Sequence, residues 1–334
     1  MHVNQEIRSG SNIGVKGFNG GLMFVLDQRL RDGEFLLLDG AIGTELQRIG
    51  VPMDDVAWCA RAMRDHPDLV RALHENYIRA GADILTTNTF SAARHVLEAA
   101  GMGGLVDDMN FKAVRLARQA RDNIDVPRNV AIAGSISRFG GRQTAPAILE
   151  ANYREQAGIL AESGVDMLLL EFLGGPISNI EIATKEAIST GLPVWLSLSC
   201  WIDEGQEARL GNRGHRSTGR DQGPWDLVSE DPLFSEAIDR LMPLGATALL
   251  VIHSEIYDVI PALEAMRKNW DGPIGAYPHS GDWVGPNWQF VNMISPEDYV
   301  EAARDWRQQG AQIVGGCCGI GENYIKLLRN AFPG

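Results

Sequence analysis

The sequence predicts an α/β fold, and within that class a single (β/α)8 barrel of the TIM type with an N-terminal extension. Short runs rich in Val, Ile and Leu alternate with segments whose apolar residues recur at helical spacing, and eight such runs occur. Three of the helical segments lead into Gly-Ala-Asp, Gly-Val-Asp or Gly-Ala-Gln, where a glycine ends the helix just before a strand. Such alternation requires parallel strands with crossover helices, and eight units suffice to close a barrel.

The length of the chain fits this prediction. Its 334 residues allow one large barrel or two average domains, and 45% hydrophobic residues are enough for a sizeable core. We expect the barrel to span residues 34–334. Residues 1–33 are rich in Gly, Ser and Asn, with one apolar patch at Leu22–Leu26. We expect them to form an extension without chemistry, which packs on the barrel or on a second subunit of a homo-oligomer.

The expected strands are apolar runs bounded by glycine or polar residues. In chain order they are Phe35–Leu38, Asp83–Thr87, Val130–Gly134, Asp166–Glu171, Val194–Ser199, Ala248–His253, Ile274–Tyr277 and Gln312–Gly316. The helices between them follow from the 3.6-residue period of the intervening segments. They include Pro67–Ala80, Asn110–Asn123, Tyr153–Ser163, Ser178–Ser189, Pro232–Leu244, Val259–Asn269 and Pro296–Gln309.

Composition and charge narrow the classes of function. The formal net charge of -13, without a basic stripe to offset it, argues against nucleic acid as a partner. Four cysteines make no disulfide framework and fit a reducing cytoplasm. No apolar run approaches the ~20 residues of a membrane span, and residues 1–33 lack the features of a signal peptide. We therefore expect a cytoplasmic protein that acts on small molecules, with neither a membrane nor a nucleic acid as partner.

Every expected strand ends in polar or metal-competent residues. In chain order these are Asp39, Thr87–Thr89, Ser135, Glu171, Ser199–Cys200, His253–Ser254, His279–Ser280 and Cys317–Cys318. The carboxyl ends of barrel strands meet at one rim, which is where such barrels carry their chemistry. We therefore expect a functional site at this rim.

The most specific strand end is the run Gly-Gly-Cys317-Cys318-Gly. Neighbouring side chains on a strand point to opposite faces, so both thiols can reach one ion only where the backbone leaves the strand conformation. The flanking glycines permit such a bend. Two thiolates within reach of one ion are half of a tetrahedral zinc site. A strained vicinal disulfide and two buried free thiols are the alternatives.

Several motifs follow one another along residues 34–332. They are the run from Asp39 to Leu46, the stretch from His66-Pro67 to Phe90, Gly134-Ser135-Ile136, Tyr277-Pro278 with Ser280-Gly281, and the paired cysteines between glycines. In this order they resemble the zinc-dependent homocysteine S-methyltransferase family, which includes S-methylmethionine and betaine enzymes. The resemblance implies a barrel whose zinc is held by the vicinal cysteines and by a third cysteine at the end of strand six. It also implies methyl transfer to homocysteine in methionine biosynthesis.

The chain departs from this family at the third ligand. The family has Gly-x-Asn-Cys at the end of strand six, where this chain reads Ile252-His253-Ser254. Alignment on the following helix places His253 at the ligand position, whereas alignment on the strand with one gap places Ser254 there. We expect His253, because imidazole is a common zinc ligand and a neutral hydroxyl is rare in that role. Cys200 is a second candidate, and a rim without metal, where His253 only forms hydrogen bonds, is the alternative.

The expected chemistry explains why such ligands are needed. A free thiol has a pKa near ~8.5, and coordination to zinc deprotonates it. Three protein ligands leave a fourth position for the substrate thiol. Two cysteines and one histidine carry one less negative charge than three cysteines, which should weaken the bound thiolate as a nucleophile. An activated donor such as a sulfonium would be less sensitive to that loss.

The resemblance also assigns two carboxylates, Asp39 and Glu171, to the amino group of homocysteine. Two acids that face one ammonium fit a partly desolvated cleft, although Asp39 could instead cap a helix. The backbone N–H groups of residues 41–44, which include Ile42, Gly43 and Thr44, open a helix and are candidate donors to the substrate carboxylate. Together these residues predict a site for an amino acid.

Further candidates concern polar contacts and the methyl donor. Asn88 and Thr89 are expected either to contact the substrate or to satisfy hydrogen bonds at the strand end. Trp58 could face a methylated cation or cover the surface. His279 stands where the family has Asn. The polar loop Trp201–Trp225 could close over the mouth or remain a solvated insertion.

Two functions remain open at this point. The first is zinc-dependent methyl transfer from a sulfonium or quaternary ammonium donor to homocysteine. The chain has neither the long C-terminal arm of the betaine enzymes nor room for cobalamin modules, so the resemblance favours the S-methylmethionine type. The second is a divergent barrel without metal, which binds a small molecule or acts on a different substrate.

Overall fold

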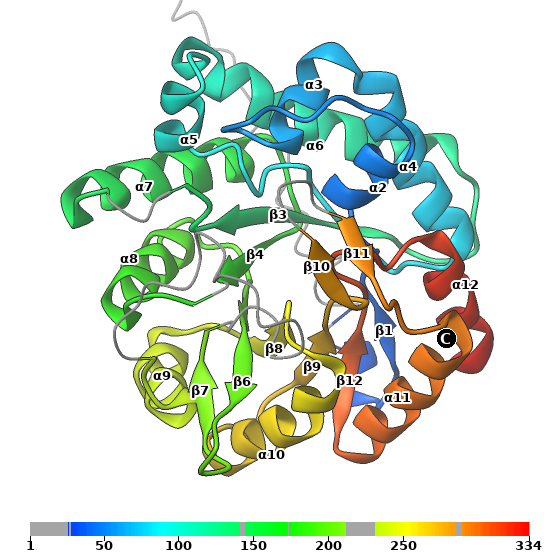
Figure 1. Ribbon diagram of the computed structural model, residues 1–334. Helices are drawn as coiled ribbons and strands as arrows, with labels where there is room; N and C mark the ends of the chain where they lie inside the picture. The colour runs from blue at the N-terminus through cyan, green and yellow to red at the C-terminus, as the bar shows by residue number, and fades with distance from the viewer. Residues whose placement is uncertain are drawn as a thin grey trace, which may run out of the picture.

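The structure, a computed structural model, describes residues 26, 28–140, 144–172, 174–211, 231–284 and 289–333. Its centre is an eight-stranded sheet in the order β1-β12-β9-β8-β5-β4-β3-β2, surrounded by helices (Figure 1). Neighbouring strands are parallel, and a parallel bridge between Leu38 and Ile84 joins β1 to β2. The sheet therefore closes on itself, and the predicted (β/α)8 barrel is confirmed.

The barrel strands coincide with the eight predicted runs. They are β1 (Leu36–Leu37), β2 (Ile84–Thr86), β3 (Ala131–Ser137), β4 (Met167–Phe172), β5 (Val194–Leu198), β8 (Ala248–Ile252), β9 (Ile274–Tyr277) and β12 (Ala311–Val314). β3 runs beyond its predicted end at Gly134, because residues 135–137 pair with residues 169–171 of β4. β8 and β12 stop before His253 and Gly315, where the prediction was too long because the chain bends there toward the barrel mouth.

The helices form the outer layer of the barrel. They are α2 (Gly43–Arg48), α3 (Ala62–Asp65), α4 (Pro67–Ala80), α5 (Arg94–Ala99), α6 (Val106–Asn123), α7 (Pro146–Glu162), α8 (Ile177–Ile188), α9 (Phe234–Leu241), α10 (Val259–Asn269), α11 (Pro296–Gln308) and α12 (Glu322–Ala331). α4 and α10 have their predicted bounds. α7 begins at Pro146 rather than Tyr153, because its buried face includes Asn152 and Gln156, which hide the apolar period.

Two short antiparallel pairs are missing from the predicted pattern. β6 (Cys200–Ile202) pairs with β7 (Ala208–Leu210) after β5, and β10 (Asp282–Val284) pairs with β11 (Gln289–Val291) after β9. Strands of three residues are too short for a period to show in the sequence. The predicted loop Trp201–Trp225 therefore starts within a β-hairpin, and its residues 212–225 lie outside the described part of the chain.

Two apolar layers hold the barrel together. The outer layer lies between the sheet and the helices, and the inner layer fills the barrel with residues such as Met167 and Trp195. Leu26 and Leu30 belong to the inner layer, and Gln312 Nε2 donates to the Leu30 carbonyl at 2.6 Å. The described part of the N-terminal extension thus packs on the barrel itself.

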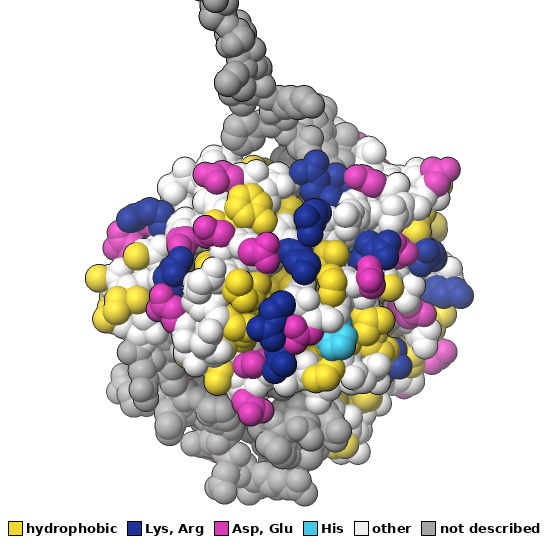
Figure 2. All heavy atoms as spheres, turned by 90° about the horizontal axis from the view of Figure 1, so that it is seen from above, with side chains coloured by type: hydrophobic (Ala, Val, Ile, Leu, Met, Phe, Trp, Pro, Cys, Tyr) yellow, Lys and Arg dark blue, Asp and Glu magenta, His cyan; other side chains and the backbone are white. Residues whose placement is uncertain are grey.

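The outer surface carries charges of both signs. Figure 2 shows basic and acidic side chains intermixed on one face, with hydrophobic side chains scattered among them. Among the described residues, no helix is long and apolar enough to span a membrane.

Candidate functional site

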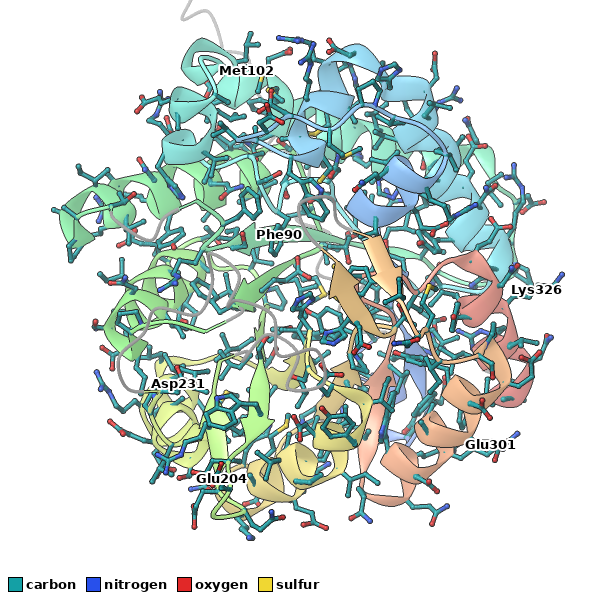
Figure 3. All side chains as sticks on the ribbon, in the orientation of Figure 1. Phe90, Met102, Glu204, Asp231, Glu301 and Lys326 are labelled. Carbon is teal, nitrogen blue, oxygen red and sulfur yellow. The ribbon has the colours of Figure 1, made fainter. Side chains whose placement is uncertain are left out.

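A pocket opens at the carboxyl ends of the barrel strands. The empty space in this pocket, including solvent at its open mouth, is about 740 Å³. Phe90 lines this pocket and lies near the barrel axis in Figure 3, whereas Glu204 and Glu301 lie on the periphery. The predicted site residues that line the pocket are Asp39, Ile42, Gly43, Thr44, Trp58, Asn88, Glu171, His253, Cys317 and Cys318.

The turn after β12 brings Cys317 and Cys318 into the pocket. A Cβ on Gly316 would lie 2.2 Å from Cγ2 of Ile320, so this turn requires glycine. The N–H of Cys317 donates to the carbonyl of Pro278 at 3.1 Å, which ties the turn to the end of β9. The two Sγ atoms are 3.9 Å apart and both thiols are free. The structure therefore shows no vicinal disulfide between them.

His253 follows β8 and completes a group of three possible ligands. Its φ of 46° lies in the left-handed region, which costs a residue with a side chain roughly 1–2 kcal/mol. Its Nδ1 lies 3.5 Å from Sγ of Cys317, and the ligand atoms of His253, Cys317 and Cys318 all lie within 4.8 Å of one another. One nitrogen and two sulfur donors are a ligand set that suits zinc.

The thiol of Cys318 is protonated at neutral pH unless a cation lies beside it. Contact with Cys317 and burial raise the pKa of the Cys318 thiol well above its ordinary value. A nearby metal ion is the usual means by which a protein holds such a thiol as a thiolate at neutral pH. The residues present thus fit a metal ion with one nitrogen and two sulfur ligands.

The alternative third ligands lie elsewhere. Cys200 is buried in the outer apolar layer, and burial raises the pKa of its thiol. The hydroxyl of Ser254 donates to the carbonyl of Ile252 at 3.0 Å and accepts from the N–H of Cys200 at 2.9 Å. Within the described residues, the group of possible ligands includes neither of them, nor His279.

Asp39 follows β1 and is only 2% exposed. Its carboxylate accepts hydrogen bonds from the N–H and the hydroxyl of Thr86, both at 2.8 Å. The helix that starts nearby has Ile42 as its N-cap residue, so the alternative that Asp39 caps this helix is wrong. Burial, together with the charge of Glu171, raises the pKa of Asp39 to about 8.

Glu171 lies near the end of β4, with a side chain that points into the same pocket. Its carboxylate accepts hydrogen bonds from the hydroxyls of Ser135 and Tyr277, the latter at 3.3 Å. Burial raises the pKa of Glu171 to about 7. No Lys or Arg is among the described residues that line the pocket. Two buried acids without a cationic side chain beside them suit a ligand that brings its own positive charge.

The start of α2 lies at the pocket wall. The first N–H groups of a helix have no partner within the helix, which leaves those of Gly43 and Thr44 as candidate donors to a ligand. The N–H of Ala41 instead donates to the carbonyl of Ile320 at 2.9 Å. The hydroxyl of Thr44 accepts from the N–H of Gly319 at 3.0 Å and so supports the cysteine turn.

The two polar residues after β2 differ in position. Asn88 lines the pocket, donates to the carbonyl of Cys59 at 3.0 Å and accepts from its thiol at 3.1 Å. Thr89 is not among the pocket residues. Its hydroxyl donates to the carbonyl of Ser135 at 2.7 Å, which fits the predicted alternative of a structural hydrogen bond.

Trp58 forms part of the pocket wall and is only 8% exposed. A Cβ on Gly43 would lie 2.3 Å from Cη2 of Trp58, so the indole covers the start of α2. Its ring stacks on Phe139 at 6.0 Å and meets the edge of Phe90 at 6.2 Å. The indole therefore belongs to an aromatic cluster beside the pocket rather than to the outer surface.

Sequence reasoning does not assign a role to several residues that line the pocket. They are Cys59, Thr86, Phe90, Ser135 and Tyr277. Ser135 is among the polar strand ends where the site was expected, although without a role, and Thr86 is a polar residue in an apolar strand, which is a signal that could have identified it. Cys59 carries no such signal, because a buried cysteine is most often a small apolar residue.

Fold and pocket together define a (β/α)8 barrel enzyme with a Cys/His group of metal-binding type beside a pair of buried acids. A family model described as Homocysteine S-methyltransferase matches residues 36–332. The chain therefore belongs to the homocysteine S-methyltransferase family, and it is a methyltransferase.

Curated relatives agree with this assignment. The chain is 26% identical over 323 residues to a selenocysteine methyltransferase of Astragalus bisulcatus, covering 86% of this chain and 89% of the relative. It is 28% identical over 306 residues to the homocysteine S-methyltransferase YbgG of Bacillus subtilis, covering 85% of this chain and 90% of the relative. The metallated homocysteine methyltransferase MmuM of Escherichia coli has a similar fold, with a TM-score of 0.73 and 23% identity. The match covers 91% of this chain and 99% of that structure.

Proposed function

We propose that this protein transfers a methyl group from a sulfonium or quaternary ammonium donor to the thiol of homocysteine, in a zinc-dependent reaction that gives methionine. The observation that carries the proposal is one pocket that combines two thiols and an imidazole with two buried acids. Family membership supports methyl transfer to homocysteine. The zinc, the donor and the residue roles are our proposal.

Asp39 and Glu171 hold the ammonium group of homocysteine in this proposal. Burial raises the pKa of both acids, to about 8 and about 7, so their ionised forms are costly without a partner. A bound ammonium offsets that cost. Thr86, Ser135 and Tyr277 each donate to one of these carboxylates, which fixes the orientation of the oxygens and leaves lone pairs for the substrate.

His253, Cys317 and Cys318 are the residues that would hold the zinc. Bound there, zinc would take the homocysteine sulfur as a further ligand and keep it deprotonated at neutral pH. The neutral imidazole of His253 replaces a charged thiolate of the family pattern, so this group carries one less negative charge. That difference favours an activated donor. We therefore expect a sulfonium of the S-methylmethionine type to be a better methyl donor than a quaternary ammonium.

The aromatic wall supports a cationic donor. Trp58 and Phe90 line the same pocket as the cysteines, and Phe139 packs behind them. Aromatic faces attract onium cations without forming a hydrogen bond, which a methylated sulfonium cannot donate. A donor bound against this wall would share a single pocket with the homocysteine.

Methionine formation tests the proposed function. The zinc-loaded protein is incubated with homocysteine and either S-methylmethionine or glycine betaine, and methionine is measured by mass spectrometry. We expect turnover with the sulfonium and a lower kcat/KM with betaine. Chelator-treated protein and Cys317→Ser serve as inactive controls. A zinc-loaded protein that binds methionine but forms none with any donor would instead support the divergent barrel without this activity.

A further inference from the structure

His279, which stands where the family has Asn, lies directly beside His253. The two imidazole ring centroids are 4.7 Å apart, with an angle of 59° between the ring planes. His279 is only 2% exposed. His253 follows β8 and His279 follows β9, so two departures of this chain from the family pattern meet at adjacent strand ends.

Two further side chains hold His279 in place. Nε2 of His279 lies 3.4 Å from Oε1 of Glu255, which comes two residues after His253. The ring of Phe290, on β11, lies 5.9 Å from the His279 ring at a tilt of 40°. His279 is thus contacted by the β8 segment through Glu255 and by the β10–β11 hairpin through Phe290.

The backbone around His279 is tied to both parts of the ligand group. The carbonyl of Pro278 accepts from the N–H of Cys317 at 3.1 Å, and the N–H of Ser280 donates to the carbonyl of Cys318 at 2.9 Å. The N–H of His253 donates to the carbonyl of Tyr277 at 3.4 Å. The segment 277–280 therefore connects the histidine to the two cysteines.

These contacts place the ring of His279 where it restricts the orientation of the His253 imidazole. His253 has a left-handed backbone, and in the observed ring orientation its Nδ1 lies 3.5 Å from Sγ of Cys317. Histidine ligands depend on the groups around them for their orientation, and the loss of an outer-shell hydrogen-bond partner typically lowers metal affinity about 10–100-fold. We expect a packed ring that fixes the ligand to have an effect of similar size. The buried ring of His279 is the neighbour that packs against the imidazole of His253.

We infer that His279 is a positioning residue, whose ring, held between Glu255 and Phe290, fixes the imidazole of His253 against Cys317. The inference rests on the proposed zinc site. It concerns the orientation of a ligand and not direct ligation, because His279 lies outside the group whose donor atoms converge. A ring without nitrogen atoms should therefore perform this task in part, because it keeps the packing on His253 but loses the contact with Glu255.

Measurements of zinc affinity distinguish a positioning role of His279 from direct ligation of the metal and from no role in the site. Competition with a chromophoric chelator is measured for the wild type, His279→Ala, His279→Phe and the control His95→Ala. His95 bonds the Phe139 carbonyl at 2.9 Å and does not line the pocket. We expect His279→Ala to bind zinc about 10–100-fold more weakly. His279→Phe should bind zinc more tightly than His279→Ala, because it retains a ring beside His253, and His95→Ala should match the wild type.

Two readouts guard against a merely structural effect. The metal-free proteins should have the same circular dichroism spectra, and cobalt-loaded His279→Ala should have altered visible bands because its ligand geometry differs. Zinc affinity of His279→Ala equal to that of the wild type would overturn the inference. Equal losses in His279→Ala and His279→Phe would overturn it in favour of direct ligation by His279. Absence of zinc binding in all four proteins would overturn the proposed zinc site itself.

Discussion

Buried acids lie at both ends of the barrel, in opposite electrostatic settings. At the amino end of the strands, the side chain of Asp83 is fully buried and faces two arginines, Arg29 at 3.0 Å and Arg329. At the carboxyl end, Asp39 and Glu171 are nearly as buried but accept hydrogen bonds from neutral groups. Burial raises the pKa of Asp39 to about 8 and that of Glu171 to about 7.

We interpret this difference as a division between acids that stabilise the fold and acids that are available to bind a ligand. A buried acid that is paired within the protein stabilises the fold, whereas a buried acid without a cationic neighbour is costly until a ligand supplies the charge. In (β/α)8 barrels the carboxyl end carries the chemistry and the amino end supports the fold. The two sets of acids in this chain follow that division.

The acids at the amino end also link neighbouring strands. Asp83 accepts from the N–H of Leu37 at 2.9 Å, and Asp166 accepts from the N–H of Ile132 at 2.8 Å. Both follow the glycine that ends a helix, in the Gly-Ala-Asp and Gly-Val-Asp triplets. Each triplet thus ends a helix, starts a strand and bonds that strand to the preceding one.

The largest expected effect is on stability at the amino end. Asp83→Asn leaves Arg29 and Arg329 without their buried partner, so we expect a loss of about 3–5 kcal/mol in the free energy of unfolding. Asp68→Asn is the matched control, because Asp68 is 88% exposed in its pair with Arg71 and should cost less than about 1 kcal/mol. Urea denaturation measures both. An Asp83→Asn protein as stable as Asp68→Asn would remove the proposed division between the two ends.

The next effect is on substrate binding at the carboxyl end. Glu171→Gln removes a charge that holds the substrate ammonium, so the KM for homocysteine should rise about 10–100-fold, equivalent to about 1.5–3 kcal/mol. Zinc content should stay unchanged, and the ligand-free protein should be no less stable at pH 8. Steady-state kinetics and metal analysis test this. Loss of zinc from Glu171→Gln would show that a metal ligand had been mistaken for a substrate contact.

The smallest effect is a pH dependence that is specific to the carboxyl end. The raised pKa values mean that Glu171 is half ionised at about pH 7 and Asp39 at about pH 8, so both acids become protonated as the pH falls toward 6. The affinity for methionine, which has an ammonium but no thiol, should therefore fall about tenfold or more between pH 8.5 and 6. Calorimetry measures it, and Glu171→Gln should show a shallower dependence. A flat profile in the wild type would argue against the acids as the ammonium site.

The raised pKa values of Asp39 and Glu171 also determine whether the stability of the folded protein rises or falls with pH. In the unfolded chain both acids ionise near pH ~4, whereas in the folded protein they ionise at about pH 7 and about pH 8. The ligand-free protein should therefore lose stability as the pH rises from about 4 to about 8. Bound methionine should restore more stability at pH 8 than at pH 6.

The fold could be predicted because its signals are local. Eight apolar runs and the glycines before Asp83 and Asp166 are enough to indicate alternating strands and helices. The hairpins β6–β7 and β10–β11 could not be predicted, because strands of three residues are too short to show a period in the sequence. The division of the chain at residue 34 stays a prediction.

The site could be predicted in part. Asp39, Glu171 and the paired cysteines stand at strand ends, and the structure brings them into one pocket. The contact between His253 and His279 could not be derived, because it depends on the φ of 46° at His253 and on the three-dimensional placement of adjacent strand ends.

Zinc content tests the proposed ligand set most directly. The wild type, His253→Ala, Ser254→Ala and Cys200→Ala are purified reduced with zinc supplied, dialysed against a chelator and analysed for metal. We predict one zinc per chain in the wild type, Ser254→Ala and Cys200→Ala, and none in His253→Ala, because two cysteines alone should not retain the ion. One zinc per chain in His253→Ala would contradict the ligand set of His253, Cys317 and Cys318.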